Sequence, residues 1–263
     1  MILLRRQLNK RKILMNNKKI YLDYDPQYQG IVKTAAYLWF VCFAIFMLQV
    51  FLVVSNLKLF NYAYTGDWNN FLQLLNTNAN QFALFKVNFL ALRTIYVITF
   101  LGYIVAVWKI HPSAALSLLG FTLVTLPVIL VVQVFQLALV PLAHDYVSAL
   151  TVSGVTEAVR SAYLVSANLL YTMTDMGDAF VILVLFNGMF VSWLFIAFQK
   201  PHPKWLGWWI IVLALLPFGM FVDLPLLELT LGLANATLTG LFFVVMGFFM
   251  LRFEPLSRKD EKK

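Results

Sequence analysis

Long apolar runs separated by short polar or basic connections dominate the chain from residue 35 onward. A helix needs roughly 17–25 mainly apolar residues to cross the hydrocarbon core of a bilayer. Six runs meet this requirement, and they cover about Ala35–Leu57, Leu84–Trp108, Ala114–Leu142, Gly177–Phe198, Trp205–Val222 and Leu226–Leu251. The pattern predicts an all-α, polytopic membrane helix bundle. Six transmembrane helices would occupy residues 34–252, between a basic tail (1–33) and a charged tail (253–263).

Two segments between these runs have the alternation of an amphipathic helix instead. In the segment 153–172, apolar residues recur at helical spacing and polar ones take the opposite face, and Ser153 is a reasonable N-cap. The predicted apolar face comprises Val155, Val159, Ala162, Ser166 and Leu169. We expect this helix to lie on the outer side of the membrane, before the fourth span. A shorter amphipathic helix is predicted within 68–75, in the first outer loop.

The basic residues are concentrated in alternate connections. Sixteen of the twenty Lys and Arg residues lie in the N-terminal tail, the connection at Lys109, the connection 199–204 and the C-terminal tail. Cytoplasmic loops carry such an excess of Lys and Arg in membrane proteins. The charges predict a multi-pass protein of the inner (cell) membrane with both termini in the cytoplasm, and an even number of spans agrees with this orientation.

Composition narrows the class further. The chain is 61% hydrophobic and 12% charged, with a mean hydropathy of +0.79, whereas soluble proteins are about a quarter charged. A single cysteine, Cys42, precludes an intramolecular disulfide and a thiolate metal site. The sequence contains no HExxH, P-loop, GxGxxG or GxSxG motif. We therefore expect no metal, no cofactor, no nucleic-acid partner and no catalytic residue of a recognised type, and the lipid bilayer is the certain partner.

Polar residues inside the spans gather in their outer halves. They are too costly in hydrocarbon to stand alone, so they form hydrogen bonds between helices or line a cavity wetted from outside. The candidates for such a cavity are Lys86, Asn88, Arg93, Gln133, Gln136, Asp178, Asn187 and Asn235. Both interpretations remain open, since bonds between helices would use the same residues.

Arg93 is the most costly of these residues, because it lies about nine residues inside the second apolar run. A long arginine side chain could reach the interface alone. It could instead pair with an acidic residue such as Asp178, at the outer end of the fourth run. Each arrangement places its charge toward the outer side.

Small residues recur in the last span at Gly232, Ala236 and Gly240. This spacing lets two helix backbones approach closely. The partner would be another helix of the same chain or, alternatively, a second copy in a homodimer.

Part of the chain resembles an uncharacterised bacterial family of integral membrane proteins. The motifs are Thr174-Asp175-Met176-Gly177-Asp178, then Phe186-Asn187-Gly188, then Pro203-Lys204-Trp205-Leu206-Gly207, within about Glu157 to Leu216. The Gly-Tyr pair expected late in the fourth span is missing. The resemblance implies a six-span bundle and assigns no activity to any residue.

Three classes of function follow from these observations. The first is binding or transport of a small polar or amphiphilic ligand through an outward-facing polar pocket, with Arg93 anchoring an anionic group. The second is a non-enzymatic accessory or assembly subunit of a membrane complex, which the absence of motifs favours. The third is an intramembrane enzyme, for which His144, Asp145 and Glu157 provide the one acid/base-like constellation.

Overall fold

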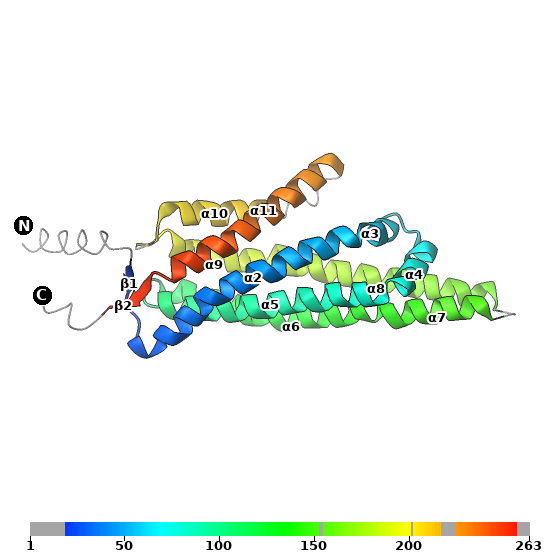
Figure 1. Ribbon diagram of the computed structural model, residues 1–263, viewed down its shortest axis with the longest axis horizontal. Coiled ribbons are helices and arrows are strands. Elements are labelled where there is room, and N and C mark those ends of the chain that lie inside the picture. Colours follow the sequence, from blue (N-terminus) through cyan, green and yellow to red (C-terminus); the bar gives the residue numbers. More distant parts are fainter. Residues whose placement is uncertain (1–18, 153–154, 201, 217–224, 257–263) are drawn as a thin grey trace, which may run out of the picture. The chain divides into compact units, whose positions relative to one another are not determined.

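The computed structural model describes residues 19–152, 155–200, 202–216 and 225–256. These residues are predominantly helical, which confirms the all-α prediction. The elements in chain order are β1 (Ile20–Leu22), the 3-10 turn η1 (Pro26–Tyr28), α2 (Gln29–Ser55), α3 (Leu57–Tyr64), α4 (Trp68–Thr77), α5 (Ala79–Val107), α6 (Pro112–Leu137), α7 (Leu139–Thr151), α8 (Glu157–Phe180), the π-helical stretch η2 (Val181–Phe186), α9 (Asn187–Ala197), α10 (Lys204–Leu215), α11 (Pro225–Met250) and β2 (Phe253–Pro255) (Figure 1).

Four helices in the described part of the chain are long and apolar enough to cross a membrane. They cover Pro26–Ser55, Ala79–Val107, Pro112–Thr151 and Glu157–Ala197. Two shorter apolar helices, Lys204–Leu215 and Ala234–Met250, correspond to the predicted fifth and sixth spans. Residues 217–224, which would complete the predicted fifth span, lie outside the described residues. The structure thus agrees with a membrane helix bundle, and it finds fewer than the six spans predicted.

The region around residues 153–178 differs from the sequence prediction in two respects. No turn separates an outer helix from the fourth span, because α8, η2 and α9 run together as one helix of 41 residues. Its N-cap is Thr156, whose side chain accepts from the backbone N–H of Val159, and the predicted cap Ser153 lies outside the described residues. The predicted apolar face was also wrong, since Leu169 is exposed and Ala167 is buried.

The chain divides into two compact units. The first comprises residues 1–43, 95–123 and 185–263, and the second comprises 44–94 and 124–184. All four of the long helices contribute to both units, so a unit is a set of helix segments and not a continuous stretch of sequence.

The core of the first unit is aromatic. Trp39 of α2 is fully buried, and its indole N–H donates to the sulfur of Met250 over 2.9 Å. Rings from three other helices surround it, and they belong to Tyr96, Phe100, Trp193, Phe242 and Phe243. Helices α2 and α5 approach closely beside this core, where a Cβ on Gly102 would come within 2.3 Å of the Ala35 Cβ.

Two short strands bring the segment before α2 beside the segment after α11. β1 and β2 pair in parallel, with Ile20 opposite Phe253 and Leu22 opposite Pro255 (Figure 1). The Nζ atom of Lys33 donates to Glu254 over 3.2 Å and to the carbonyl of Leu251 over 2.5 Å. These contacts hold the start of α2 against the segment that follows α11.

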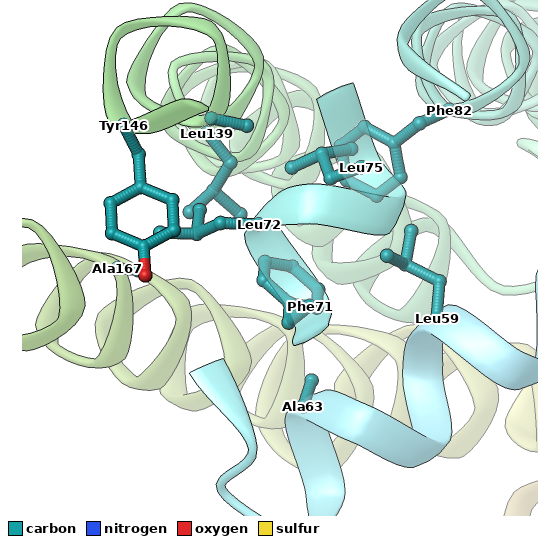
Figure 2. Packing of buried hydrophobic residues seen from close by; sticks show 10 residues of the cluster. Leu59, Ala63, Phe71, Leu72, Leu75, Phe82, Leu139, Tyr146 and Ala167 are labelled. Carbon is teal, nitrogen blue, oxygen red and sulfur yellow. The ribbon is translucent and has the colours of Figure 1, made fainter. Parts of the chain in front are cut away.

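The second unit is organised around the small helix α4, which the sequence analysis predicted within 68–75. Asp67 caps it by accepting from the backbone N–H of Asn70. Its apolar face packs into the protein interior, because Phe71, Leu72 and Leu75 are fully buried. Figure 2 shows these side chains among residues of neighbouring helices, and the cluster also contains Leu59, Ala63, Phe82, Leu139, Ala143, Tyr146 and Ala167. The helix is therefore a structural element of this unit.

Candidate functional site

A cluster of polar side chains lies in the second unit, where α5, α6 and α8 supply one face each. We call Lys86, Arg93, Gln133, Gln136 and Asp178 the polar cluster. Lys86 and Arg93 stand seven residues apart on α5, which places them two turns apart on the same face. All five residues are candidates predicted from the sequence, and the fold brings them into one unit.

Asp178 is the acidic member of the polar cluster. Its Oδ2 atom accepts a hydrogen bond of 2.9 Å from Nε2 of Gln136. Both Lys86 and Arg93 attract its carboxylate, and the attraction to Lys86 is the larger. Asp178 thus has two compensating cations, Lys86 and the Arg93 that the sequence suggested as its partner.

Aromatic rings accompany both cations. The Lys86 side chain is 8% exposed, and its ammonium lies 4.6 Å from the ring centroid of Phe85 and 5.2 Å from that of Phe82. The guanidinium of Arg93 lies 4.7 Å from the ring centroid of Phe89. Rings attract cations through their quadrupole, and this attraction offsets part of the cost of removing the charges from water.

Gln133 is the most deeply buried member of the polar cluster. The residue is 1% exposed, and within the described residues neither its amide nitrogen nor its amide oxygen has a hydrogen-bond partner. It lies one turn before Gln136, on the α6 face that packs on α8. The helices meet closely there, since a Cβ on Gly177 would lie 2.6 Å from Cγ2 of Val132. A buried amide without partners costs free energy, so its retention calls for an explanation.

The remaining candidates lie elsewhere. Asn88 donates to Oε1 of Gln49 over 2.7 Å and to the carbonyl of Ile45 over 3.2 Å, so it joins α5 to α2. Asn187 and Asn235 belong to the first unit, where Oδ1 of Asn235 accepts from Thr239 over 3.3 Å. Six of the eight predicted residues therefore belong to the second unit, and two belong to the first.

The predicted packing motif of the last span is described in part. Gly240 is buried and Ala236 is half-buried on α11, which contacts α10. The surroundings of Gly232 lie outside the described residues.

The three residues of the acid/base hypothesis are exposed side chains of α7 and α8. His144 and Asp145 are exposed on α7, and Glu157 pairs with Arg160 of its own helix over 3.9 Å. Within the part of the chain that the structure describes, no group of three or more His, Cys, Asp or Glu side chains could hold a metal ion.

One buried polar pair escaped the sequence analysis. The hydroxyl of Tyr103 lies 3.0 Å from Nε2 of His202, and Nδ1 of His202 lies 3.3 Å from the carbonyl oxygen of Gln199. The carbonyl can only accept, so Nδ1 carries the proton and Nε2 accepts from the tyrosine. Burial lowers the pKa of His202 to about 4, so the ring is neutral at physiological pH. The pair attaches the connection between α9 and α10 to α5.

Comparisons with known proteins found no matching family model, no matching curated protein and no matching solved structure. Function is therefore inferred from the geometry of the chain itself.

Proposed function

We propose that the protein is a six-span membrane protein of the inner membrane with both termini in the cytoplasm. The four long apolar helices support a membrane location. The two shorter apolar helices α10 and α11 would supply the fifth and sixth spans. The orientation rests on the Lys and Arg residues in alternate connections.

Cysteine labelling tests this orientation. In a Cys42→Ala background, Ser148→Cys places an exposed thiol on α7, and Gln199→Cys places one in the connection after α9. An impermeant thiol reagent added outside intact cells should label Ser148→Cys and not Gln199→Cys. The reverse result would invert the topology.

We propose further that the polar cluster binds a small polar or amphiphilic ligand that carries an anionic group. The observation that supports this function is the buried, unpartnered amide of Gln133. A ligand oxygen could accept from its nitrogen, and a ligand hydroxyl could donate to its oxygen. The bound ligand would then supply the hydrogen bonds that the chain leaves unmade.

The charges of the cluster favour an anion. Lys86 and Arg93 are cationic, and Asp178 is the one acidic member. Asp178 also accepts from Gln136, so part of its charge is already compensated. An anionic group near Lys86 would gain a charge-assisted hydrogen bond, which is about twice as strong as a neutral one.

Thermal unfolding with a chosen probe tests the proposal. Dodecyl phosphate should raise the unfolding temperature of the wild-type protein in a concentration-dependent way, because a ligand that binds the folded state stabilises it. The variants Gln133→Leu and Lys86→Met should lose most of this rise, whereas Gln73→Leu on the exposed face of α4 should keep it. An equal rise in all four proteins would exclude the polar cluster as the site.

The assembly-subunit hypothesis has an observation of its own. Val165, Leu169 and Met173 form an exposed apolar row on α8. The helix from Glu157 to Ala197 has 41 residues, and its length of roughly 60 Å is about twice the hydrocarbon thickness. An apolar row beyond the hydrocarbon favours a protein partner.

Site-specific photocrosslinking distinguishes this second candidate. A photoreactive residue at Leu169 should crosslink to a protein partner in membranes, and one at the neighbouring exposed position Asn168 should crosslink far less. Equal crosslinking at both positions would remove the support for a partner on this row.

A further inference from the structure

A groove lies in the first unit, at the end where α5 stops and α6 begins. Its volume is about 1400 Å³, and its walls come from α5, the segment between β1 and η1, the start of α6 and the end of β2. Ordinary small-molecule pockets measure roughly 300–1,000 Å³. The groove is therefore large enough for a lipid-sized molecule, and it involves none of the residues of the polar cluster.

The groove changes character along its length. Leu101, Ile104 and Val105 line it with one face of α5, and Trp108 continues this lining just after the helix ends. Lys109 is the last residue of this lining. The Cα atom of Leu101 lies roughly 12 Å from that of Lys109 along the helix axis, at about 1.5 Å per residue. One end is thus charged and the other is apolar, which is the pattern of an amphiphile.

Both signs of charge meet at the polar end. Nζ of Lys109 lies 2.8 Å from Oδ1 of Asp23, and both side chains are more than half exposed. Asp25 is a second carboxylate in the groove lining, and its Oδ1 accepts from the backbone N–H of Gln27. Tyr28 and Trp108 add half-exposed rings at the same level, as expected where a protein meets the interface of a bilayer.

We propose that this groove binds one phosphatidylethanolamine molecule of the surrounding bilayer. The lipid phosphate contacts Lys109, the primary ammonium donates to the carboxylates of Asp23 and Asp25, and an acyl chain lies along α5 toward Leu101. The exposed Lys109–Asp23 pair is weak enough for a headgroup to enter. Under the orientation proposed above, the lipid belongs to the cytoplasmic leaflet.

The charges select this lipid over its competitors. An anionic lipid or a fatty acid would bring negative charge toward two carboxylates and one lysine. A phosphatidylcholine headgroup has no N–H to donate, so it leaves the carboxylates without hydrogen bonds. A zwitterion with a primary ammonium matches both signs.

Native mass spectrometry of the purified full chain tests the assignment. The protein would be delipidated in detergent and titrated with equal amounts of phosphatidylethanolamine, phosphatidylcholine and phosphatidylglycerol. We expect one retained phosphatidylethanolamine per chain, with a preference over phosphatidylcholine of about tenfold, since charge-assisted hydrogen bonds are at stake. Equal retention of the three lipids, or a preference for either of the other two, would overturn the proposal.

Three variants locate the lipid. Val105→Trp fills the groove and should abolish retention, whereas Leu116→Trp adds the same bulk at a position 60% exposed on α6 and should have no effect. Asp23→Asn should reduce the preference over phosphatidylcholine toward parity. If Val105→Trp binds phosphatidylethanolamine like the wild type, the groove is not the site.

A measurement on the wild-type protein tests the site without relying on a variant that could fail to fold. A phosphatidylethanolamine with a photoreactive acyl chain should crosslink within residues 101–119, and excess unlabelled phosphatidylethanolamine should compete. Crosslinks spread evenly over the exposed apolar faces of the helices would show ordinary bilayer contact and contradict a specific site.

Discussion

Gln136 donates from Nε2 to Oδ2 of Asp178 over 2.9 Å, and this bond joins α6 to α8 in the second unit. Gln133 stands one turn earlier on the same helix, is buried slightly more deeply (1% exposed against 6%) and makes no hydrogen bond with the described residues. Two residues of one type on one helix face thus have opposite roles. One of them connects two helices, and the other keeps an amide available.

This contrast predicts opposite effects of one substitution. Gln133→Leu should stabilise the ligand-free protein by about 1 kcal/mol, because it removes a buried amide without partners. Gln136→Leu should destabilise it by about 1–3 kcal/mol, because Asp178 loses its donor. Unfolding curves of the two variants in one detergent would show the difference, and a loss of stability in both would contradict the unpartnered state of Gln133.

The ranking of the two cations leads to a second prediction. Asp178 is attracted more by Lys86 than by Arg93. Lys86→Met should therefore cost more stability than Arg93→Leu, with a loss of about 1–3 kcal/mol, since a carboxylate loses its main compensating charge. The double variant Lys86→Met with Asp178→Asn should recover part of this loss.

The control for this series is Lys58→Met, because Lys58 is exposed on α3 and its substitution should change stability by less than about 0.5 kcal/mol. A larger loss in Arg93→Leu than in Lys86→Met would return the leading role to Arg93.

Protonation of His202 should destabilise the first unit in acid. Burial lowers the pKa of His202 from 6.5 to about 4, so the unfolded chain binds the proton more tightly than the folded one. Neutral His202 makes its full contribution to the free energy of unfolding above pH 6.5. This contribution decreases as the pH drops from 6.5 toward 4. The loss should reach about 3 kcal/mol at most.

Thermal unfolding between pH 7.5 and pH 4 tests this expectation. The variant His202→Gln should have a shallower dependence on pH than the wild type over this range. His144→Gln changes an exposed histidine of α7 and should keep the wild-type dependence. Identical pH profiles in all three proteins would show that His202 titrates normally.

Packing of α4 supplies a further prediction. Leu72 is fully buried in the cluster of the second unit, and Leu72→Ala should cost about 2–5 kcal/mol through lost burial and a cavity. Gln73→Ala changes the next residue, which is exposed, and should cost less than about 0.5 kcal/mol. Chemical unfolding of the two variants would compare them, and a silent Leu72→Ala would mean that α4 is not an integral part of this unit.

The sequence by itself determined the helices and their apolar character. The predicted run Leu84–Trp108 corresponds to α5 (Ala79–Val107), because length and hydrophobicity are local properties and a helix satisfies its own backbone in an apolar environment. The small helix α4 was also predictable, since an Asp cap and an amphipathic pattern are local signals.

The predicted separation of the outer helix (153–172) from the fourth span (Gly177–Phe198) failed because tertiary contacts override local signals. Asp175, Gly177 and Asp178 resemble a turn in the sequence, but Gly177 sits in a helix where Val132 of α6 packs against it. Asp178 is tolerated there because Gln136 and Lys86 compensate it. Neither partner is near in sequence.

Tertiary structure alone decided which polar residues are paired and which are not. Gln133 and Gln136 are indistinguishable in sequence, and the distinction arises from Asp178, which lies 42 residues after Gln136. Tyr103 and His202 are 99 residues apart in the sequence. The groove beside α5 is likewise lined by residues from near both ends of the chain. Hydrogen bonds and grooves depend on the distance between atoms in space, whereas the sequence pattern records only the neighbours along one helix.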